Sequence, residues 1–186
     1  MSHYFFAGKI PSETKLAMKN NIIELKKQFP FRRWVHHEDL HITLAFLGAA
    51  PEDKLERACS LVGGTLVKAD SFSLAINGLG IFGRKDSPRV FWASLSKSEE
   101  LTNLRASVFT ACEEAGFQLE TRPFSPHVTL ARNWEGEFPF NPGKLDEQPL
   151  NLGFMLEEVV LYRTNIESTP KYEPVQRFRL TALNQQ

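Results

Sequence analysis

The sequence has no excess of charge of either sign. Its 22 Lys and Arg residues balance 22 Asp and Glu residues, so the formal net charge at pH 7 is zero. Proteins that coat long nucleic acids neutralise many phosphates and normally carry a basic excess. The balanced composition argues against that class, although it leaves room for a local group of arginines around a single phosphate.

Cysteines and long apolar runs are also scarce. The two cysteines, Cys59 and Cys112, lie in helix-like segments without metal-ligand spacing, so we expect reduced, half-buried thiols. No apolar run approaches the roughly 20 residues needed to cross a bilayer. The first residues show no charged leader followed by a long apolar segment. We therefore expect a cytoplasmic protein that does not use a membrane.

What the sequence does contain is a tetrad that it spells twice, as His41-Ile42-Thr43-Leu44 and as His127-Val128-Thr129-Leu130. In an extended strand, side chains two residues apart lie on the same face. Each histidine should therefore share one face with its threonine, while the aliphatic residues share the buried face. Two such strands facing one cavity would bring together two imidazoles and two hydroxyls, which suits the binding and cleavage of a phosphate ester.

The repetition extends beyond the tetrads. At the same sequence offset, Phe5-Phe6-Ala7 overlays Phe91-Trp92-Ala93, and each half reads as a strand, a helix, a loop and a His-x-Thr strand. Repetition at half the chain length indicates approximate twofold symmetry. We expect an α+β fold with antiparallel sheets flanked by helices, in which residues 1–186 form a single domain of two interleaved lobes. The active cleft should lie between the lobes.

Local patterns predict the individual elements. Pro11-Ser12-Glu13 should open a helix that buries Leu16, Ile22, Ile23 and Leu25 and ends at Phe29-Pro30. Asn77-Gly78 indicates a hairpin or a bulge. Further helices are expected over 51–67 and 98–115, and strands over 4–8, 40–47, 72–76, 79–82, 89–95, 154–162 and 176–180, besides the second His-x-Thr strand.

The sequence resembles a known family over nearly its whole length. The residues that carry the resemblance are Arg33-Trp34-Val35, the segments 40–48 and 124–132 around the tetrads, Pro88-Arg89-Val90-Phe91-Trp92, and Leu161-Tyr162-Arg163. They are similar to the two-histidine (2H) phosphoesterases, in the branch of RNA 2′,3′-cyclic phosphodiesterases that are also called 2′-5′ RNA ligases. The resemblance implies hydrolysis of a 2′,3′-cyclic phosphate to a 2′-phosphate.

The paired tetrads fit that chemistry. Hydrolysis needs a base that takes a proton from water and an acid that protonates the leaving ribose oxygen, and histidine can serve either role near neutral pH. We expect His127 to be the base and His41 the acid, although the near-symmetry would allow the reverse. Thr43 and Thr129 would donate hydrogen bonds to the phosphate oxygens. This scheme requires no metal and no cofactor, and no Cys or carboxylate cluster offers a metal site.

Four further residues are candidates for the site. Arg132 is a phosphate-binding candidate because it matches a family position at the end of its strand, although a regular strand would point it away from the His127 face. Phe82, Trp134 and Trp34 are candidates for stacking on a base. For Trp34, ordinary packing is the favoured alternative, and for Trp134 packing and stacking are equally favoured.

Several functions remain open at this stage. The expected partner is an RNA 3′ end or a 2′,3′-cyclic nucleotide, bound by a monomer, and reversible 2′-5′ RNA ligation would be a minor activity. The same cleft could instead belong to a non-catalytic nucleotide-binding module, or to a cyclic phosphodiesterase that acts on another small nucleotide. Binding alone does not need two proton-transfer groups, so the intact tetrads favour an enzyme.

Overall fold

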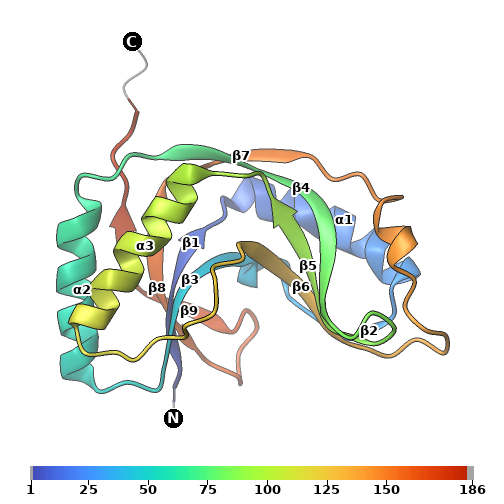
Figure 1. Ribbon diagram of the computed structural model, residues 1–186, viewed down its shortest axis with the longest axis horizontal. Coiled ribbons are helices and arrows are strands. Elements are labelled where there is room, and N and C mark those ends of the chain that lie inside the picture. Colours follow the sequence, from blue (N-terminus) through green and yellow to red (C-terminus); the bar gives the residue numbers. More distant parts are fainter. Residues whose placement is uncertain (1, 184–186) are drawn as a thin grey trace.

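The computed structural model describes residues 2–183, which form nine strands and three helices joined by two short 3-10 helices (Figure 1). The strands are β1 (Tyr4–Lys9), β2 (Phe31–Trp34), β3 (His41–Gly48), β4 (Phe72–Gly83), β5 (Pro88–Leu95), β6 (His127–Trp134), β7 (Leu152–Leu156), β8 (Glu158–Thr164) and β9 (Tyr172–Arg179). The helices are α1 (Ser12–Gln28), α2 (Glu52–Leu66) and α3 (Glu99–Glu114), and the 3-10 helices are η1 (His37–Asp39) and η2 (Pro142–Leu145).

The strands form two antiparallel sheets, as the sequence predicts. One sheet has the order β3-β1-β8-β9 and the other has the order β2-β6-β5-β4-β7. Strands β3 and β6, which carry the two tetrads, contact each other across the junction of the sheets. The two histidine strands are therefore neighbours in space although 86 positions separate their first residues in the sequence.

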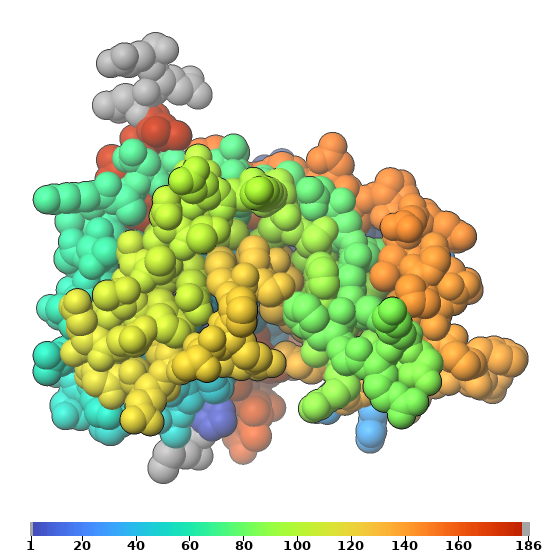
Figure 2. Space-filling view, in the orientation of Figure 1, coloured from blue at the N-terminus to red at the C-terminus, as the bar shows by residue number. Residues whose placement is uncertain are grey.

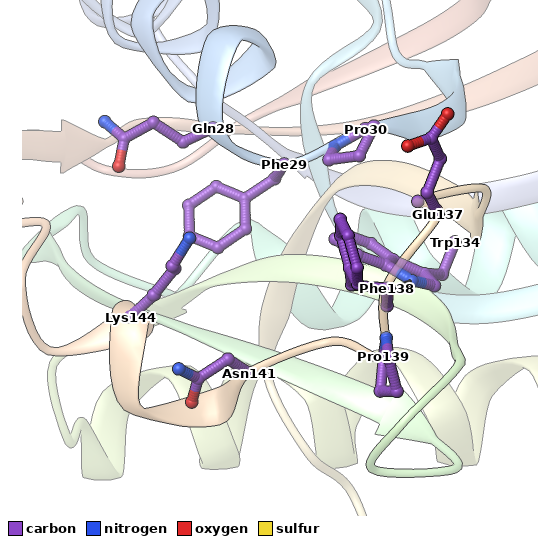
Figure 3. Close-up of a pocket in the computed structure, with 10 residues that line it drawn as sticks. Gln28, Phe29, Pro30, Trp134, Glu137, Phe138, Pro139, Asn141 and Lys144 are labelled. Carbon is purple, nitrogen blue, oxygen red and sulfur yellow. Dashed lines mark hydrogen bonds between the residues drawn. The ribbon is translucent and has the colours of Figure 1, made fainter.

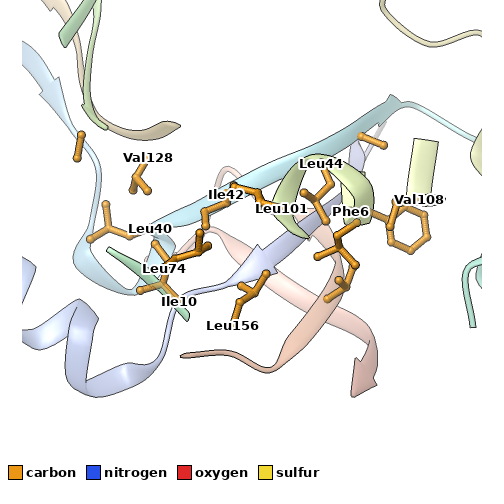
Figure 4. Close-up of a cluster of buried hydrophobic side chains, with 14 of the residues drawn as sticks. Phe6, Ile10, Leu40, Ile42, Leu44, Leu74, Leu101, Val108, Val128 and Leu156 are labelled. Atoms are coloured by element: carbon orange, nitrogen blue, oxygen red, sulfur yellow. The ribbon is translucent and has the colours of Figure 1, made fainter. Parts of the chain in front are cut away.

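The helices cover the outer faces of the sheets. Helices α2 and α3 lie side by side, and α3 contacts β3 while α2 contacts β9 (Figure 1). Apolar side chains of both sheets and all three helices form one large buried core, in which Ile42, Leu44 and Val128 of the tetrads take part (Figure 4). Within residues 2–183, no helix is both long and apolar enough to span a bilayer.

The internal repeat is visible in the strand pairing, but the expected overlay of Phe5-Phe6-Ala7 on Phe91-Trp92-Ala93 is wrong by one residue, because Phe6 corresponds to Phe91 and Ala7 to Trp92. Strand β1 pairs with β3 as β5 pairs with β6, and both pairs carry a bulge at the same place. In the first pair, Phe6 opposes Ala45 and Ala7 opposes Thr43, so Leu44 of β3 has no partner and is the extra residue. In the second pair, Phe91 opposes Ala131 and Trp92 opposes Thr129, so Leu130 of β6 is the extra residue. An extra residue shifts the alternation of faces by one. The repeated unit is thus the pentad His-x-Thr-Leu-Ala, whose Leu and Ala are both buried.

Some sequence predictions need correction. Leu16 and Ile23 of α1 are 54% and 47% exposed, because the buried stripe of this helix begins at Thr14 and Met18. The expected strand 154–162 is two strands, since the chain leaves one sheet at Glu157 and enters the other as β8. The Asn77-Gly78 signal produces a bulge inside the single long strand β4. Cys59 and Cys112 are free and buried, on α2 and α3.

Candidate active site

The two histidines are the first residues of β3 and β6, at the junction of the sheets. The segment before β3 is tied to β6 by a hydrogen bond from the Val35 N–H to the Leu130 carbonyl, 2.9 Å long. The chain that leads into β6 lies between α3 and the β4–β5 end of the second sheet (Figure 2). Strands β3 and β6 contact each other, and each begins at its histidine. The repeat therefore brings both imidazoles to one place.

Both imidazoles are held in the same way. The Nδ1 of His41 lies 2.7 Å from the carbonyl oxygen of Asp39, and the Nδ1 of His127 lies 2.7 Å from the carbonyl oxygen of Ser125. A carbonyl can only accept a hydrogen bond, so each Nδ1 carries the hydrogen and each neutral ring has an unprotonated Nε2. The site thus presents two Nε2 atoms that can accept or, once protonated, return a proton.

Aromatic side chains surround the His41 ring. Phe5 and Tyr172 lie 4.8 Å and 5.1 Å from it between ring centroids, and Tyr172 meets it edge-on. The Nε2 of His41 is 3.0 Å from the Thr43 hydroxyl, which confirms that this His and Thr share a face. Tyr172 is positioned by Asp39, whose buried carboxylate accepts hydrogen bonds from the backbone N–H groups of Lys171 and Tyr172.

Asp39 is a further residue of the candidate site, and the sequence patterns did not point to it. Its carbonyl orients His41 while its carboxylate holds the start of β9, so one residue joins the imidazole to its aromatic neighbour. The signal that could have found it is its spacing, because Asp39 precedes His41 by two positions as Ser125 precedes His127.

Phe82, one of the three residues expected to stack on a base, lies against His127. Its ring meets the His127 ring edge-on with centroids 5.0 Å apart, and Trp92 lies 6.1 Å from the same imidazole. Gly80 makes this arrangement possible, because a Cβ at that position would overlap the indole of Trp92. Phe82 and Trp92 thus form an aromatic wall beside the second histidine.

Burial controls the charge state of both histidines. It lowers the pKa of His41 to about 4, partly opposed by the hydrogen bond to the Asp39 carbonyl. Burial also lowers the pKa of His127 below its usual value, and the charge of Arg132 lowers it further. Removing an imidazole from water penalises its charged form, so both rings are neutral near pH 7 in the free protein.

Arg132 lies on the histidine face because of the bulge in β6. On a regular strand it would point away from His127, but the extra residue Leu130 reverses the alternation. Arg33 of β2 is directly opposite Arg132 in the antiparallel pairing, so the two side chains are neighbours on one face. Within residues 2–183, neither arginine forms an ion pair. Two adjacent, unpaired guanidinium groups favour a bound anion.

Trp34 and Trp134 lie away from the histidines. The Trp34 ring packs edge-on against Phe31 and against the fully buried Phe91. Trp134 packs against Phe31, and its indole N–H donates to the carbonyl of Phe138, beside a separate pocket of about 210 Å³ (Figure 3). Both indoles take part in packing, and of the three expected base-stacking residues the structure brings only Phe82 to a histidine. Stacking of Trp34 or Trp134 on a base stays a prediction.

The residues that the structure describes contain no candidate metal site. In the range 2–183, no three His, Cys, Asp or Glu side chains cluster in a way that could hold a metal ion. The chemistry available at the β3–β6 junction is thus proton transfer by two imidazoles, with hydrogen bonding by two hydroxyls and charge from Arg132.

Comparison with known proteins places the chain in a family. The model of the 2′-5′ RNA ligase superfamily matches residues 15–165. A Geobacillus stearothermophilus protein named RNA 2′,3′-cyclic phosphodiesterase is 46% identical over 180 residues, covering 96% of this chain and 57% of that relative, so the chain spans little more than half of it. A Bacillus subtilis protein of the same name is 35% identical over 182 residues, covering 96% of this chain and 97% of the relative.

Solved structures agree with the sequence relatives. Escherichia coli LigT complexed with 3′-AMP superposes with a TM-score of 0.77 at 26% identity, covering 97% of this chain and 98% of that one. TT0787 of Thermus thermophilus gives a TM-score of 0.78 at 25% identity, covering 98% of this chain and 100% of that one. With its two His-x-Thr strands, the chain therefore belongs to the 2′-5′ RNA ligase superfamily of 2H phosphoesterases.

Proposed function

We propose that this protein hydrolyses 2′,3′-cyclic phosphates at RNA 3′ ends or on nucleotides to 2′-phosphates, without a metal ion. The observation that carries the proposal is the pair of carbonyl-held imidazoles on repeated strands at one junction. The names of the relatives from Geobacillus and Bacillus support the substrate class. In this proposal, residues 1–186 act as one domain of two lobes, and a single chain supplies every group that the reaction needs.

The phosphate would be held by Thr43, Thr129 and Arg132. The two hydroxyls can donate hydrogen bonds to the non-bridging oxygens, where negative charge increases in the transition state. Arg132, with Arg33 beside it, supplies positive charge to the same group. Phe82 can pack against the base or the ribose of the terminal nucleotide.

We assign His127 as the base and His41 as the acid. Burial, together with the charge of Arg132, lowers the pKa of His127 and leaves its Nε2 free to take a proton from water. Burial also lowers the pKa of His41, to about 4, so its acid role depends on the charge of the bound phosphate. The water oxygen then attacks phosphorus, and the bond from phosphorus to the 3′ oxygen breaks. Protonated His41 gives its Nε2 proton to that oxygen. A bound phosphodiester carries one negative charge, which favours the imidazolium form of His41 in the complex.

Product analysis with purified protein and adenosine 2′,3′-cyclic phosphate tests this proposal. We expect adenosine 2′-monophosphate as the product, identified by chromatography against the 2′ and 3′ isomers. Binding of the cyclic nucleotide without turnover would support the alternative function of a non-catalytic nucleotide-binding module. Formation of the 3′ isomer would contradict the assignment of the leaving oxygen.

The pH dependence of kcat/KM should be bell-shaped with an acidic optimum. One imidazole must be neutral while the other is protonated, and burial lowers both pKa values in the free protein. The optimum of kcat/KM should therefore lie below pH ~6.5, the usual histidine value. The limbs of kcat should lie at higher pH, because the charge of the bound phosphate raises both pKa values. A kcat/KM that rises steadily from about pH 5 to about pH 9 would show that the reaction needs no protonated histidine, and it would contradict the acid role.

Hydrolysis should persist after removal of metal ions. Dialysis against EDTA is expected to leave kcat/KM within about twofold, because the proposed steps use only protein groups and water. The control is the same dialysed sample with Mg²⁺ or Mn²⁺ added back. A loss of activity that either ion restores would identify a metal site and contradict this scheme.

A further inference from the structure

A second cavity lies beside the site, on the His41 side. It has a volume of about 340 Å³ and is lined by residues of α1, η1, β1, β8 and β9. Three basic side chains, Lys9, Lys15 and Arg177, line it together with the aromatic rings of Tyr162 and Tyr172. We call it the basic cavity. The proposed hydrolysis uses none of its three cations.

The basic cavity adjoins the imidazole of His41. Lys9 is directly opposite His41 in the β1–β3 pairing, so the two side chains are neighbours on one face of the sheet. Tyr172 and Tyr162 line the cavity and lie 5.1 Å and 6.4 Å from the His41 ring between centroids. Arg177 opposes Val160, which packs with Phe5 on this same face. A strand of RNA that ends at the histidines can therefore continue into the cavity.

The charges around the cavity are only partly balanced. One carboxylate, Glu158, is shared between Lys9 at 3.2 Å and Arg177 at 3.6 Å. The Lys15 ammonium donates to the neutral carbonyl oxygen of Glu38 at 2.8 Å. Burial lowers the pKa of Lys15, and the positive charges of Lys9 and Arg177 lower it further. The negative charges of Asp39 and Glu38 raise this pKa and so partly oppose the shift. The Asp39 carboxylate is already occupied by backbone N–H groups. An anion placed among these three cations would therefore be stabilised.

We propose that the basic cavity binds the phosphate that links the terminal nucleotide to its 5′ neighbour, so that the enzyme prefers RNA ends over cyclic mononucleotides. This inference rests on the proposed function and specifies its substrate. Cations beside aromatic rings are the combination by which proteins bind single-stranded nucleic acid, with charge on the backbone and rings against the bases or sugars. Because the chain has no net charge, this local cluster is not a product of a basic composition.

The test compares two substrates in three proteins. The substrates are adenosine 2′,3′-cyclic phosphate and the dinucleotide ApA with the same cyclic end; the proteins are the unchanged chain, Arg177→Gln and Arg57→Gln. Arg57 is an exposed arginine on α2, and this helix packs on the opposite face of the same sheet. Arg57→Gln therefore removes the same charge as Arg177→Gln at a place outside the cavity. We expect the unchanged chain and Arg57→Gln to favour the dinucleotide by about 10-fold or more in kcat/KM. Arg177→Gln should lose most of this preference and keep its mononucleotide activity within about twofold.

Neutralising the linkage provides the complementary experiment. A dinucleotide with a methylphosphonate in place of the internal phosphate should react no faster than the mononucleotide, and the preference should fall with added salt. Equal kcat/KM for the two substrates, or equal losses on both in Arg177→Gln, would overturn the inference. Calorimetric affinities of deoxyadenosine 3′-phosphate and its dinucleotide need no turnover. These affinities test the cavity even if the protein hydrolyses neither cyclic substrate. Failure to hydrolyse either substrate would refute only the proposed function.

Discussion

Replacing either His41 or His127 with alanine is expected to lower kcat for cyclic phosphate hydrolysis by about 10²–10⁴-fold. Each imidazole performs its own proton transfer through an Nε2 atom, so neither can substitute for the other. Each variant loses the ring and its hydrogen bond to a carbonyl, and His41→Ala also loses the bond to the Thr43 hydroxyl, while the buried face of each strand is unchanged. Thermal unfolding should therefore show that both variants remain folded.

The matched control is His36→Ala. The His36 imidazole accepts a hydrogen bond from the Glu38 N–H at the start of η1 and is not held by a carbonyl as the two site histidines are. Its loss should leave kcat within about twofold, since it takes no part in proton transfer. A His127→Ala protein with near-native kcat would refute the two-histidine mechanism.

An activated substrate separates the two roles. A phosphodiester with a nitrophenyl leaving group expels a weakly basic oxygen, which needs no proton from the enzyme. His41→Ala should then recover most of its lost kcat, whereas His127→Ala should still lack the base. Recovery in His127→Ala instead would reverse the assignment of acid and base while keeping the mechanism.

The shared face of histidine and threonine was predictable from the sequence because the relevant signal is local. Side chains alternate along a strand, so the order His, aliphatic, Thr, aliphatic places the imidazole and hydroxyl together without knowledge of the fold. The structure agrees, since Thr43 is bonded to His41 while Ile42 and Leu44 are buried. The repeat at 127–130 then predicted a second, equivalent strand.

Contacts between distant segments were not predictable from local patterns. Asp39 reaches the start of β9, more than 130 residues away, through hydrogen bonds to backbone groups that carry no sequence signature. Arg132 reaches the histidine face only through a bulge, which depends on the pairing partner as much as on the strand itself. The rings that pack against Trp34 and Trp134 come from other strands, Phe91 of β5 and Phe31 of β2, so local patterns could not indicate these contacts.

Replacing Thr43 or Thr129 with valine is the second large expected effect, a loss of about 10- to 150-fold in kcat/KM. One hydrogen bond to a charged oxygen is worth about 1.5–3 kcal/mol, which corresponds to that range. Valine is β-branched and nearly the same shape as threonine, so each strand should be preserved. The loss should appear mainly in kcat/KM, because the ground-state phosphate is already charged and loses the same bond. Thr→Ser at each position keeps the hydroxyl and should retain most of the activity.

The two threonines should differ in one respect. Thr43 Oγ1 is bonded to the Nε2 of His41, whereas within residues 2–183 the Nε2 of His127 has no such bond. A hydroxyl that donates to Nε2 stabilises the neutral ring, so Thr43→Val should raise the pKa of His41 and move one limb of the kcat/KM profile toward higher pH. Thr129→Val should lower the whole profile without moving either limb. If both valine variants hydrolyse the cyclic phosphate at the parental rate, the hydroxyls do not contact the phosphate, and the shared face of His and Thr serves only to orient the imidazole.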